Sequence, residues 1–469
     1  HKYISGQKYT YADQMIWWVY NDKGNIHTET GGEAIGIEVH ALAFSFKTND
    51  VLNDMTFYRY SLLNRATSSL DSTFMSQWID ADLGCYLDDY VGCDTTRGLG
   101  IVYNQTAVDG GSGCSADYGD QPPMLGIDYF KGPKDQNGTE LKMSRFSYYS
   151  NDFSPTGNPE VASHYYGYMS GTWKDGTPYT EGGNGHGGTT PTHFLFPSSP
   201  DDPSGWSQCT GGTTGQDPRF MISSGPFRLD PGASNEIVIG VPWVRPPKGT
   251  YPCPKFTLLQ KADDKAQALF DNCFAILEGP PAPDVEVVEM DKELVLALDN
   301  TSEIETYQIK DPTISAQGYA DSLYRFQGYK IYQVQNSQVT TQELNDASKA
   351  RLIAQVDLKD NVTKLINYNY DPILESDVPE LMVDGNNAGI KHTFQVLTDA
   401  FATGDNRLVN HKTYYFTVIS YAYNGYTDTA GNILQKQPYL EGRKNIKVYS
   451  AIPHIVSPED FGMTLNSKY

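Results

Sequence analysis

The clearest pattern along the chain is the alternation of hydrophobic and polar residues over short stretches. It occurs at residues 35–46, 55–64, 72–80 and 235–243, and again at 293–300, 326–335, 411–424 and 444–450. A period of two places every second side chain on one face of a β-strand. Ile237, Ile239 and Val241 share a face in this way. We therefore expect a mainly β protein built from antiparallel β-sandwiches.

One segment, residues 257–277, has the helical period instead. Its apolar residues, among them Leu259 and Ala266, recur at steps of three and four. Asp263 and Asp264 fall between them, on the face that this pattern predicts to be polar. We expect a structural helix that closes the first domain.

The chain has 469 residues, too many for one ordinary hydrophobic core, so we expect two main domains. Proline and glycine cluster at residues 279–288, which is typical of a linker between β-sandwich modules. The expected order is an N-terminal arm at 1–30, a loop-rich β-sandwich with one helix at 31–278, the linker at 279–288, a second β-sandwich at 289–452 with an insertion at 340–407, and a tail at 453–469.

Charge narrows the range of partners. The chain has 57 acidic and 35 basic residues, a formal net charge of −22. Such a surface repels phosphate backbones and anionic lipid, so we expect no nucleic-acid partner. No stretch reaches the roughly 18 apolar residues of a membrane helix, so we expect no membrane insertion.

The chain has six cysteines without the CxxC spacing of a zinc or redox site: Cys85, Cys93, Cys114, Cys209, Cys253 and Cys273. An even number in an acidic, tyrosine-rich chain favours disulfides and an extracellular or cell-surface location. Sequence does not determine the pairing. We expect Cys85 with Cys93 and Cys253 with Cys273; the alternative is that some are buried thiols.

Five aspartates crowd into fifteen positions between two strand-like stretches: Asp80, Asp82, Asp88, Asp89 and Asp94. Neighbouring carboxylates repel unless a cation or solvent neutralises them, and calcium takes oxygen ligands from flexible acidic loops. The five residues are candidate calcium ligands, with calcium as the candidate cofactor. Solvated turn residues are the alternative.

A second candidate site lies between residues 146 and 179, where aromatic residues are dense. Its members are Tyr148, Tyr149, Tyr165, Tyr166, Tyr168, Trp173, Asp175 and Tyr179. Aromatic faces stack on sugar rings and carboxylates accept hydrogen bonds from hydroxyls, so a glycan or partner surface is one interpretation. The favoured alternative is that these side chains pack long loops onto the sandwich.

Catalytic motifs are absent from the sequence. There is no GxSxG elbow, HExxH helix, P-loop or Rossmann glycine fingerprint. With so many carboxylates, a pair at glycosidase spacing would arise by chance. We therefore expect the protein not to be an enzyme.

Four segments carry a resemblance to known proteins. DLGCYLDDYVGCDTTRGLGIVYN at residues 82–104 and SSGPFRLDPGASNEIVIGVPWVR at 223–245 resemble large secreted surface proteins of the Bacteroidota that the type IX secretion system exports. GYKIYQ at 328–333 and TYYFTVISYAYN at 413–424 resemble strands of a fibronectin type III domain. This resemblance implies that residues 289–452 form such a domain with an insertion.

Together these observations predict a non-enzymatic extracellular protein that acts structurally or adhesively in a surface coat, adhesin or filament-like assembly. Its expected partners are protein neighbours or copies of itself, with glycans as further candidates. Disulfides and calcium would stabilise it. The alternatives are a secreted carbohydrate-binding or carbohydrate-degrading protein, or a passenger region of type IX secretion.

Overall fold

The computed structural model describes residues 2–4, 7–9, 12–48, 50–215, 217–271, 273–274, 276–311, 322–427 and 435–455. The chain forms two compact units, His1–Ala275 and Ile276–Tyr469. Both units consist mainly of antiparallel β-sheet, which confirms the predicted fold class. The boundary between the two units lies just before the expected linker at 279–288. Among the helices of the described ranges, none is long and apolar enough to cross a membrane.

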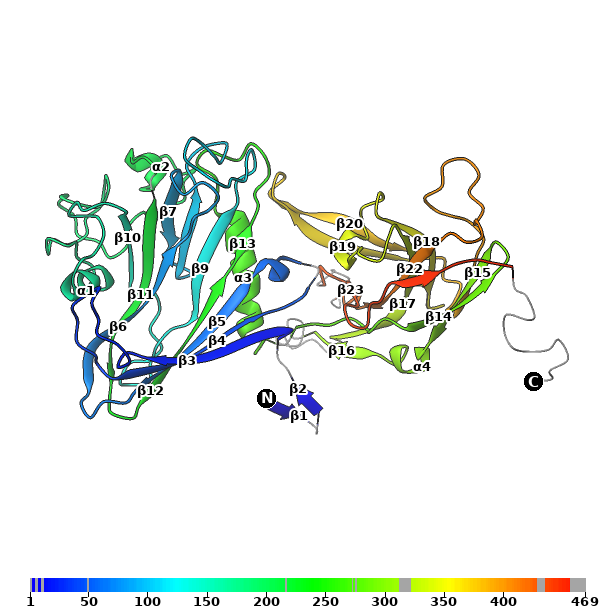
Figure 1. The fold of residues 1–469 in the computed structure, drawn as a ribbon, viewed down its shortest axis with the longest axis horizontal. Coiled ribbons are helices and arrows are strands. Elements are labelled where there is room, and N and C mark those ends of the chain that lie inside the picture. Colours follow the sequence, from blue (N-terminus) through cyan, green and yellow to red (C-terminus); the bar gives the residue numbers. More distant parts are fainter. Residues whose placement is uncertain are drawn as a thin grey trace. The chain divides into compact units, whose positions relative to one another are not determined.

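The first unit is organised around a large antiparallel sheet (Figure 1). Its strands follow the spatial order β3 (Gln14–Asn21), β4 (Ile37–Ser45), β5 (Thr56–Asn64), β12 (Ser234–Val241), β9 (Met124–Lys131), β8 (Leu99–Asn104) and β7 (Asp89–Asp94), and β13 (Trp243–Val244) also pairs with β9. The expectation of an N-terminal arm at 1–30 is wrong in one respect. Residues 14–21 form the edge strand of this sheet, because they pair along their whole length with β4.

A smaller sheet packs against one face of the large one. It consists of β10 (Arg145–Ser150), β11 (Pro218–Leu229) and β6 (Leu70–Asp80). Between the two sheets lies the main core, in which Ile237 and Ile239 of β12 join Phe146 of β10 and Ile222 of β11. The predicted alternation of β12 thus faces the core of a β-sandwich.

Helix α3 (Thr257–Asp271) covers the other face of the large sheet (Figure 1). Phe270 stacks on Phe130 of β9, with ring centroids 6.0 Å apart. The helix ends before the predicted residue 277 because Cys273 and Phe274 adopt left-handed backbone conformations, both with φ of 57°. The prediction that Asp263 lies on the polar face is wrong, since Asp263 is buried with Leu259 and Ala266.

Long loops and short elements complete the first unit. The short elements are β1 (Lys2–Ile4), β2 (Gln7–Tyr9), η1 (Val51–Asp54), α1 (Ala162–Ser170) and α2 (Gln208–Gly211). Helix α1 contacts β6, β10 and β11. It ends at Gly171, whose φ of 108° suits a residue without a side chain.

The second unit also contains two main antiparallel sheets. One has the order β14 (Asp284–Met290), β15 (Glu293–Asp299) and β21 (Thr393–Val396). The other has the order β16 (Gln308–Lys310), β17 (Leu323–Val334), β22 (Tyr414–Tyr423) and β23 (Tyr439–Glu441), with β18 (Ala350–Asp357) beside β17 and β24 (Tyr449–Ala451) beside β22. The remaining elements are α4 (Thr301–Ile304), η2 (Thr341–Glu343) and the hairpin β19 (Lys364–Asp371) and β20 (Ser376–Asp384).

The insertion at 340–407 forms strands. β18 belongs to the sheet of β17 and β21 to the sheet of β15, whereas β19 and β20 form a separate two-stranded sheet. At the start of β22, the buried Tyr414 hydroxyl accepts a hydrogen bond from the Val409 amide at 2.9 Å. This bond to the backbone a few residues upstream is the contact that a tyrosine corner makes in β-sandwiches.

Candidate functional site

The five aspartates of the acidic segment lie in different surroundings, so they do not form one site. Asp80, at the end of β6, pairs with Arg219 at 3.1 Å, and Arg219 also pairs with Asp217 at 2.7 Å. The exposed Asp82 has a carboxylate oxygen within 4.8 Å of those of Asp80 and Asp217. Burial and the Asp217 charge raise the pKa of Asp80, although Arg219 opposes them. Arg219 thus supplies a positive charge beside the carboxylates of Asp80, Asp82 and Asp217.

Asp94, at the other end of the segment, stabilises the turn from β7 to β8. Its side chain accepts hydrogen bonds from the Thr96 amide and from Gln260 of α3, and it pairs with Arg97 at 2.9 Å. Burial acts to raise the pKa of Asp94, but the hydrogen bonds from Arg97 and Gln260 lower it overall. Asp94 therefore joins β7 to α3 and is not a ligand together with Asp88.

Asp88 and Asp89 lie instead beside Asp109, from the loop that follows β8. Asp109 is buried, and its two carboxylate oxygens accept hydrogen bonds from the amides of Cys85, at 2.9 Å, and Tyr118, at 2.5 Å. One carboxylate oxygen of Asp88 lies within 4.8 Å of one of Asp109. Asp89 is 1% exposed, and its Oδ2 accepts from the Leu83 amide at 3.0 Å.

Asn104 completes this group. It lies directly opposite Asp89 in the β7–β8 pair, so both side chains project from the same face of the hairpin. Its amide nitrogen donates to Thr106, whose hydroxyl donates to Asp88 Oδ2 at 3.3 Å. We name Asp88, Asp89, Asn104 and Asp109 the inner acidic cluster.

Three oxygen atoms of the inner acidic cluster are buried without a hydrogen-bond partner: Oδ1 of Asp88, of Asp89 and of Asn104. Burial, as the main cause, raises the pKa of Asp89 to about 9 together with the charges of Asp88, Asp109 and Asp82, while the hydrogen bond from Leu83 opposes them. Burial and the charge of Asp109 also raise the pKa of Asp88. The charged groups that act on these two carboxyls are therefore acidic.

The cysteines pair differently from the expectation. Disulfides join Cys85 to Cys114 and Cys209 to Cys253, whereas Cys93 and Cys273 are free thiols. Cys93 cannot reach Cys85 because it is a buried residue of β7, where its thiol contacts the Leu195 carbonyl at 3.5 Å. The Cys85–Cys114 disulfide closes the loop that carries the inner acidic cluster.

The aromatic segment is mostly part of the core. Tyr148 and Tyr149 belong to β10, and Tyr165, Tyr166 and Tyr168 belong to α1. The buried members are Tyr148, Tyr149, Tyr168, Trp173 and Tyr179. Tyr166 and Asp175 are exposed and Tyr165 is half-buried. The buried rings contact each other edge to face around Trp173, so these members pack the core as the favoured alternative predicted.

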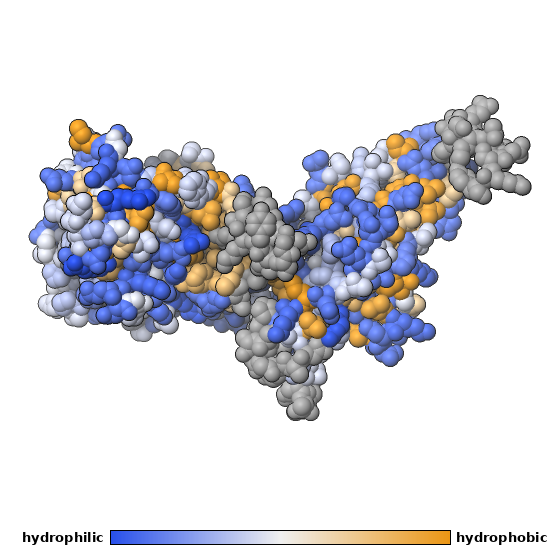
Figure 2. Space-filling model, turned by 90° about the horizontal axis from the view of Figure 1, so that it is seen from below, coloured by the Kyte–Doolittle hydropathy of each residue, from blue (hydrophilic) through white to orange (hydrophobic). Residues whose placement is uncertain are grey.

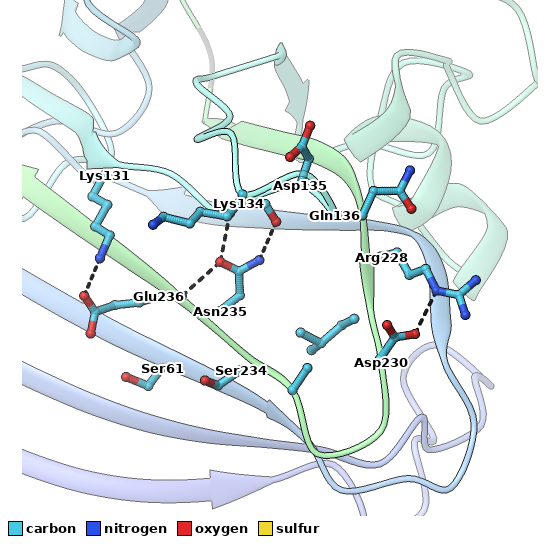
Figure 3. Close-up of a pocket in the computed structure, with 13 residues that line it drawn as sticks. Ser61, Lys131, Lys134, Asp135, Gln136, Arg228, Asp230, Ser234, Asn235 and Glu236 are labelled. Atoms are coloured by element: carbon cyan, nitrogen blue, oxygen red, sulfur yellow. Dashed lines mark hydrogen bonds and ion pairs between the residues drawn. The ribbon is translucent and has the colours of Figure 1, made fainter.

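The pocket in Figure 3 is a polar hollow of about 550 Å³. Several of its charged groups pair with one another or with near neighbours. Glu236 accepts a hydrogen bond from Lys131, and Arg228 pairs with Asp230 at 2.8 Å (Figure 3). Glu236 also accepts a hydrogen bond from Arg59 of β5. These contacts indicate no particular ligand, so we assign no function to the pocket.

Strand β3 is the most unusual surface of the first unit. All eight of its residues are exposed, including Ile16 at 57% and Trp17 at 63%. Its sequence, QMIWWVYN, contains no charge and presents large apolar side chains on both faces. On the side shown in Figure 2, hydrophilic surface predominates and hydrophobic residues form separate patches. Exposed apolar surface of this extent marks an interaction site.

In the described part of the chain, no strand pairs with the outer side of β3. The Asp22 amide donates to the Ile37 carbonyl, so even-numbered residues face β4 in the alternating pattern of antiparallel strands. The amides and carbonyls of the odd-numbered residues, such as Trp17 and Val19, then point to the open edge. β3 lies at the end of the sheet order, so this edge is a template for a further strand.

Sequence reasoning missed two members of the inner acidic cluster and all of β3. Asn104 ends a strand, and Asp109 lies fifteen residues beyond Asp94, so neither stands out beside the crowded aspartates. No model of a known protein family matches the chain, and no curated protein matches it significantly.

Proposed function

We propose that this protein is a non-enzymatic structural component of an extracellular assembly, in which copies of the chain join edge to edge through β3. The exposed, uncharged strand β3 is the observation that carries the proposal. The two disulfides are compatible with an extracellular location. The resemblance of residues 82–104 to exported surface proteins belongs to the same proposal.

A second copy is the partner that fits both faces of β3. A strand that pairs with this edge must itself be apolar on both faces, since large side chains project on each side. β3 meets this requirement. The net charge of −22 opposes contact between copies over most of the surface, and β3 offers eight consecutive positions without charge.

The free backbone groups also restrict the register. Odd-numbered residues carry the outward amides and carbonyls, so two antiparallel copies pair with odd residues opposite odd residues. In the register centred on Trp18, Trp17 of one copy faces Val19 of the other, and Ile16 faces Tyr20. The same register brings the strand end that carries Asp13 beside the end that carries Lys23 of the other copy. We therefore favour this register over its neighbours.

The test is light scattering after size-exclusion chromatography over a concentration series. The unmodified chain is expected to form dimers or larger species. Val19→Pro removes an amide that points to the open edge and leaves the bonds to β4 in place, so this variant should be monomeric. Val19→Thr keeps the amide and suits a strand, so it should associate like the unmodified chain.

A charge variant tests the register. Lys23→Glu should weaken association and make it more sensitive to salt, because it places two acidic groups near each other at each strand end. A chain that stays monomeric at every concentration contradicts the proposal. So does a dimer that Val19→Pro leaves intact, which would place the contact elsewhere.

A further inference from the structure

The second unit contains a pocket of its own, which we name the second-unit pocket. Its volume is about 480 Å³, within the range of roughly 300–1,000 Å³ that is typical of small-molecule sites. The lining comes from β17, from the turn after β18, and from the end of β22 with the residues that follow it. β16 pairs with β17 as far as Arg325, and β18 pairs with it from Gly328 onward. The pocket therefore lies where β17 passes from one neighbouring strand to the next.

Strand β17 is irregular at this place. In its pairing with β22, Phe326 and Gly328 lie opposite consecutive residues, so Gln327 is the extra residue of a β-bulge. Bulges re-aim side chains and are frequent beside functional sites. The side-chain nitrogen of Gln327 donates to both carboxylate oxygens of Asp360, at 3.1 and 3.2 Å. The bulge thus holds a hydrogen-bond acceptor, Asp360, in the lining of the pocket.

Asn424 supplies a buried donor that lacks an acceptor. The residue lines the pocket and is 4% exposed. Its side-chain oxygen accepts from the Tyr426 amide at 3.1 Å, whereas its side-chain nitrogen has no hydrogen-bond partner. Such a donor costs free energy unless a ligand or a water molecule accepts from it. Among the described residues that line the pocket in Figure 3, none has a buried side-chain atom without a partner.

Aromatic rings form much of the apolar part of the second-unit pocket. Tyr423, at the end of β22, and the buried Phe326 both line it. A Cβ atom at Gly425 would lie 1.7 Å from the Tyr423 hydroxyl oxygen, so the turn after β22 needs glycine to leave room for this side chain. Burial, with the charge of Asp360 in the same direction, raises the pKa of Tyr423. Its hydroxyl therefore stays protonated and can donate a hydrogen bond.

These groups restrict the chemistry of a ligand. The charged residues of the described lining are Arg325 and Asp360, which have opposite signs, so the lining favours neither a cation nor an anion. Asn424 needs an acceptor and Asp360 accepts hydrogen bonds, and a hydroxyl group can serve both because it donates and accepts. The C–H faces of a sugar ring also pack against aromatic rings.

We propose that the second-unit pocket binds a ring of a neutral saccharide, with Asn424 donating to one hydroxyl and Asp360 accepting from another. Polar groups that converge between aromatic side chains are typical of small-ligand sites. The proposal does not depend on association through β3, because every residue that carries it belongs to the second unit.

The test is saturation-transfer NMR of the full chain with D-glucose, D-galactose, D-mannose and N-acetyl-D-glucosamine, each as the free sugar and as its methyl glycosides. At least one of these sugars should bind at millimolar concentration. Asp360→Asn replaces an acceptor oxygen with a donor and should weaken that binding at least about tenfold. Asp230→Asn makes the same exchange in the pocket of Figure 3, so it is the matched control and should keep the affinity of the unmodified chain.

Melting temperatures check the folding of the variants. Asp360 is exposed, so Asp360→Asn should melt at nearly the same temperature as the unmodified chain. Asn424→Asp removes the unpartnered donor and should also weaken binding; if this variant does not fold, Tyr423→Phe serves as the second variant. Absence of binding by all of these sugars overturns the proposal. Loss of binding in Asp230→Asn but not in Asp360→Asn also overturns it, since the sugar would then occupy the other pocket.

The methyl glycosides distinguish two sources of the same sugar. Binding of a glycoside supports the proposal with the end of a glycan chain as the ligand. Binding of the free sugar alone supports it with a free monosaccharide as the ligand.

Discussion

Asp128 on β9 and Asp263 on α3 lie beside each other where the helix crosses the large sheet, and both residues are buried. Burial, as the main cause, raises the pKa of Asp263 to about 7; the charges of Asp264 and Asp94 act in the same direction and Arg97 opposes them. Burial and the charge of Asp263 raise the pKa of Asp128 as well. The pair therefore holds a proton that an unfolded chain would release.

This pair predicts that stability falls as pH rises. An unfolded aspartate ionises near 3.8, whereas folded Asp263 stays protonated until about pH 7. Its contribution to stability is complete below pH 3.8 and is lost as pH rises from there to about 7. Asp263→Asn should flatten this part of the profile and increase the free energy of unfolding at pH 8 by more than about 1 kcal/mol. Urea titrations at several pH values measure this free energy of unfolding.

Asp271→Asn is the control for the pH profile. Asp271 ends the same helix but is exposed, so its neutralisation should leave the slope between pH 4 and 7 unchanged. Equal slopes for the unmodified chain and Asp263→Asn would show that the buried pair is ionised in the folded state.

The buried pair also shows where the sequence pattern reaches its limit. Hydrophobic periodicity predicted α3 and its apolar residues, but it placed Asp263 on the polar face because the pattern holds no information about Asp128, which comes from a strand 135 positions earlier. The strands β4, β5, β6 and β12 were predictable for the opposite reason. Their alternation is local, and one buried face imposes it.

Strand β3 and the inner acidic cluster were harder to predict from the sequence, for two different reasons. QMIWWVYN has no alternation because neither of its faces is buried, so it lacked the usual signal of a strand. The acidic segment did predict Asp88 and Asp89 as candidate ligands. It could not predict Asp109, which a disulfide and backbone hydrogen bonds bring to them from outside the segment.

The thiols should differ in reactivity. Cys93 is fully buried, and burial raises its pKa well above the ordinary value, while Cys273 is exposed. A maleimide should therefore modify Cys273 alone in the folded chain, and both thiols after unfolding without reductant. Mass spectrometry of the peptides checks this. Modification of Cys85 or Cys209 without reductant would contradict the disulfide assignment.

Trp173 should be among the most sensitive residues of the first unit. It is 1% exposed, its indole donates to the Gly185 carbonyl at 2.9 Å, and its ring contacts Tyr148, Tyr168 and Tyr179. Trp173→Ala should destabilise the unit by about 3–5 kcal/mol. Tyr166→Ala removes an exposed aromatic from the same region and should cost less than about 1 kcal/mol. Similar losses in urea unfolding would mean that Trp173 is not central to this core.

Position 84 should require glycine because Asp109 lies close to it, and not only because of its backbone conformation. Its φ is 80°, and a Cβ atom there would lie 1.9 Å from Asp109 Oδ2. Gly176 has the same φ of 80° with open space around it. Both alanine variants bear the cost of a left-handed residue, about 1 kcal/mol, but only Gly84→Ala also displaces a buried carboxylate.

We therefore expect Gly84→Ala to cost at least about 2 kcal/mol more than Gly176→Ala in chemical unfolding. The displacement would also break the bonds from Asp109 to the Cys85 and Tyr118 amides. Amide exchange should consequently accelerate at Cys85 and Tyr118 in Gly84→Ala and stay unchanged there in Gly176→Ala. Equal effects of the two substitutions would show that Asp109 does not depend on the space that Gly84 leaves.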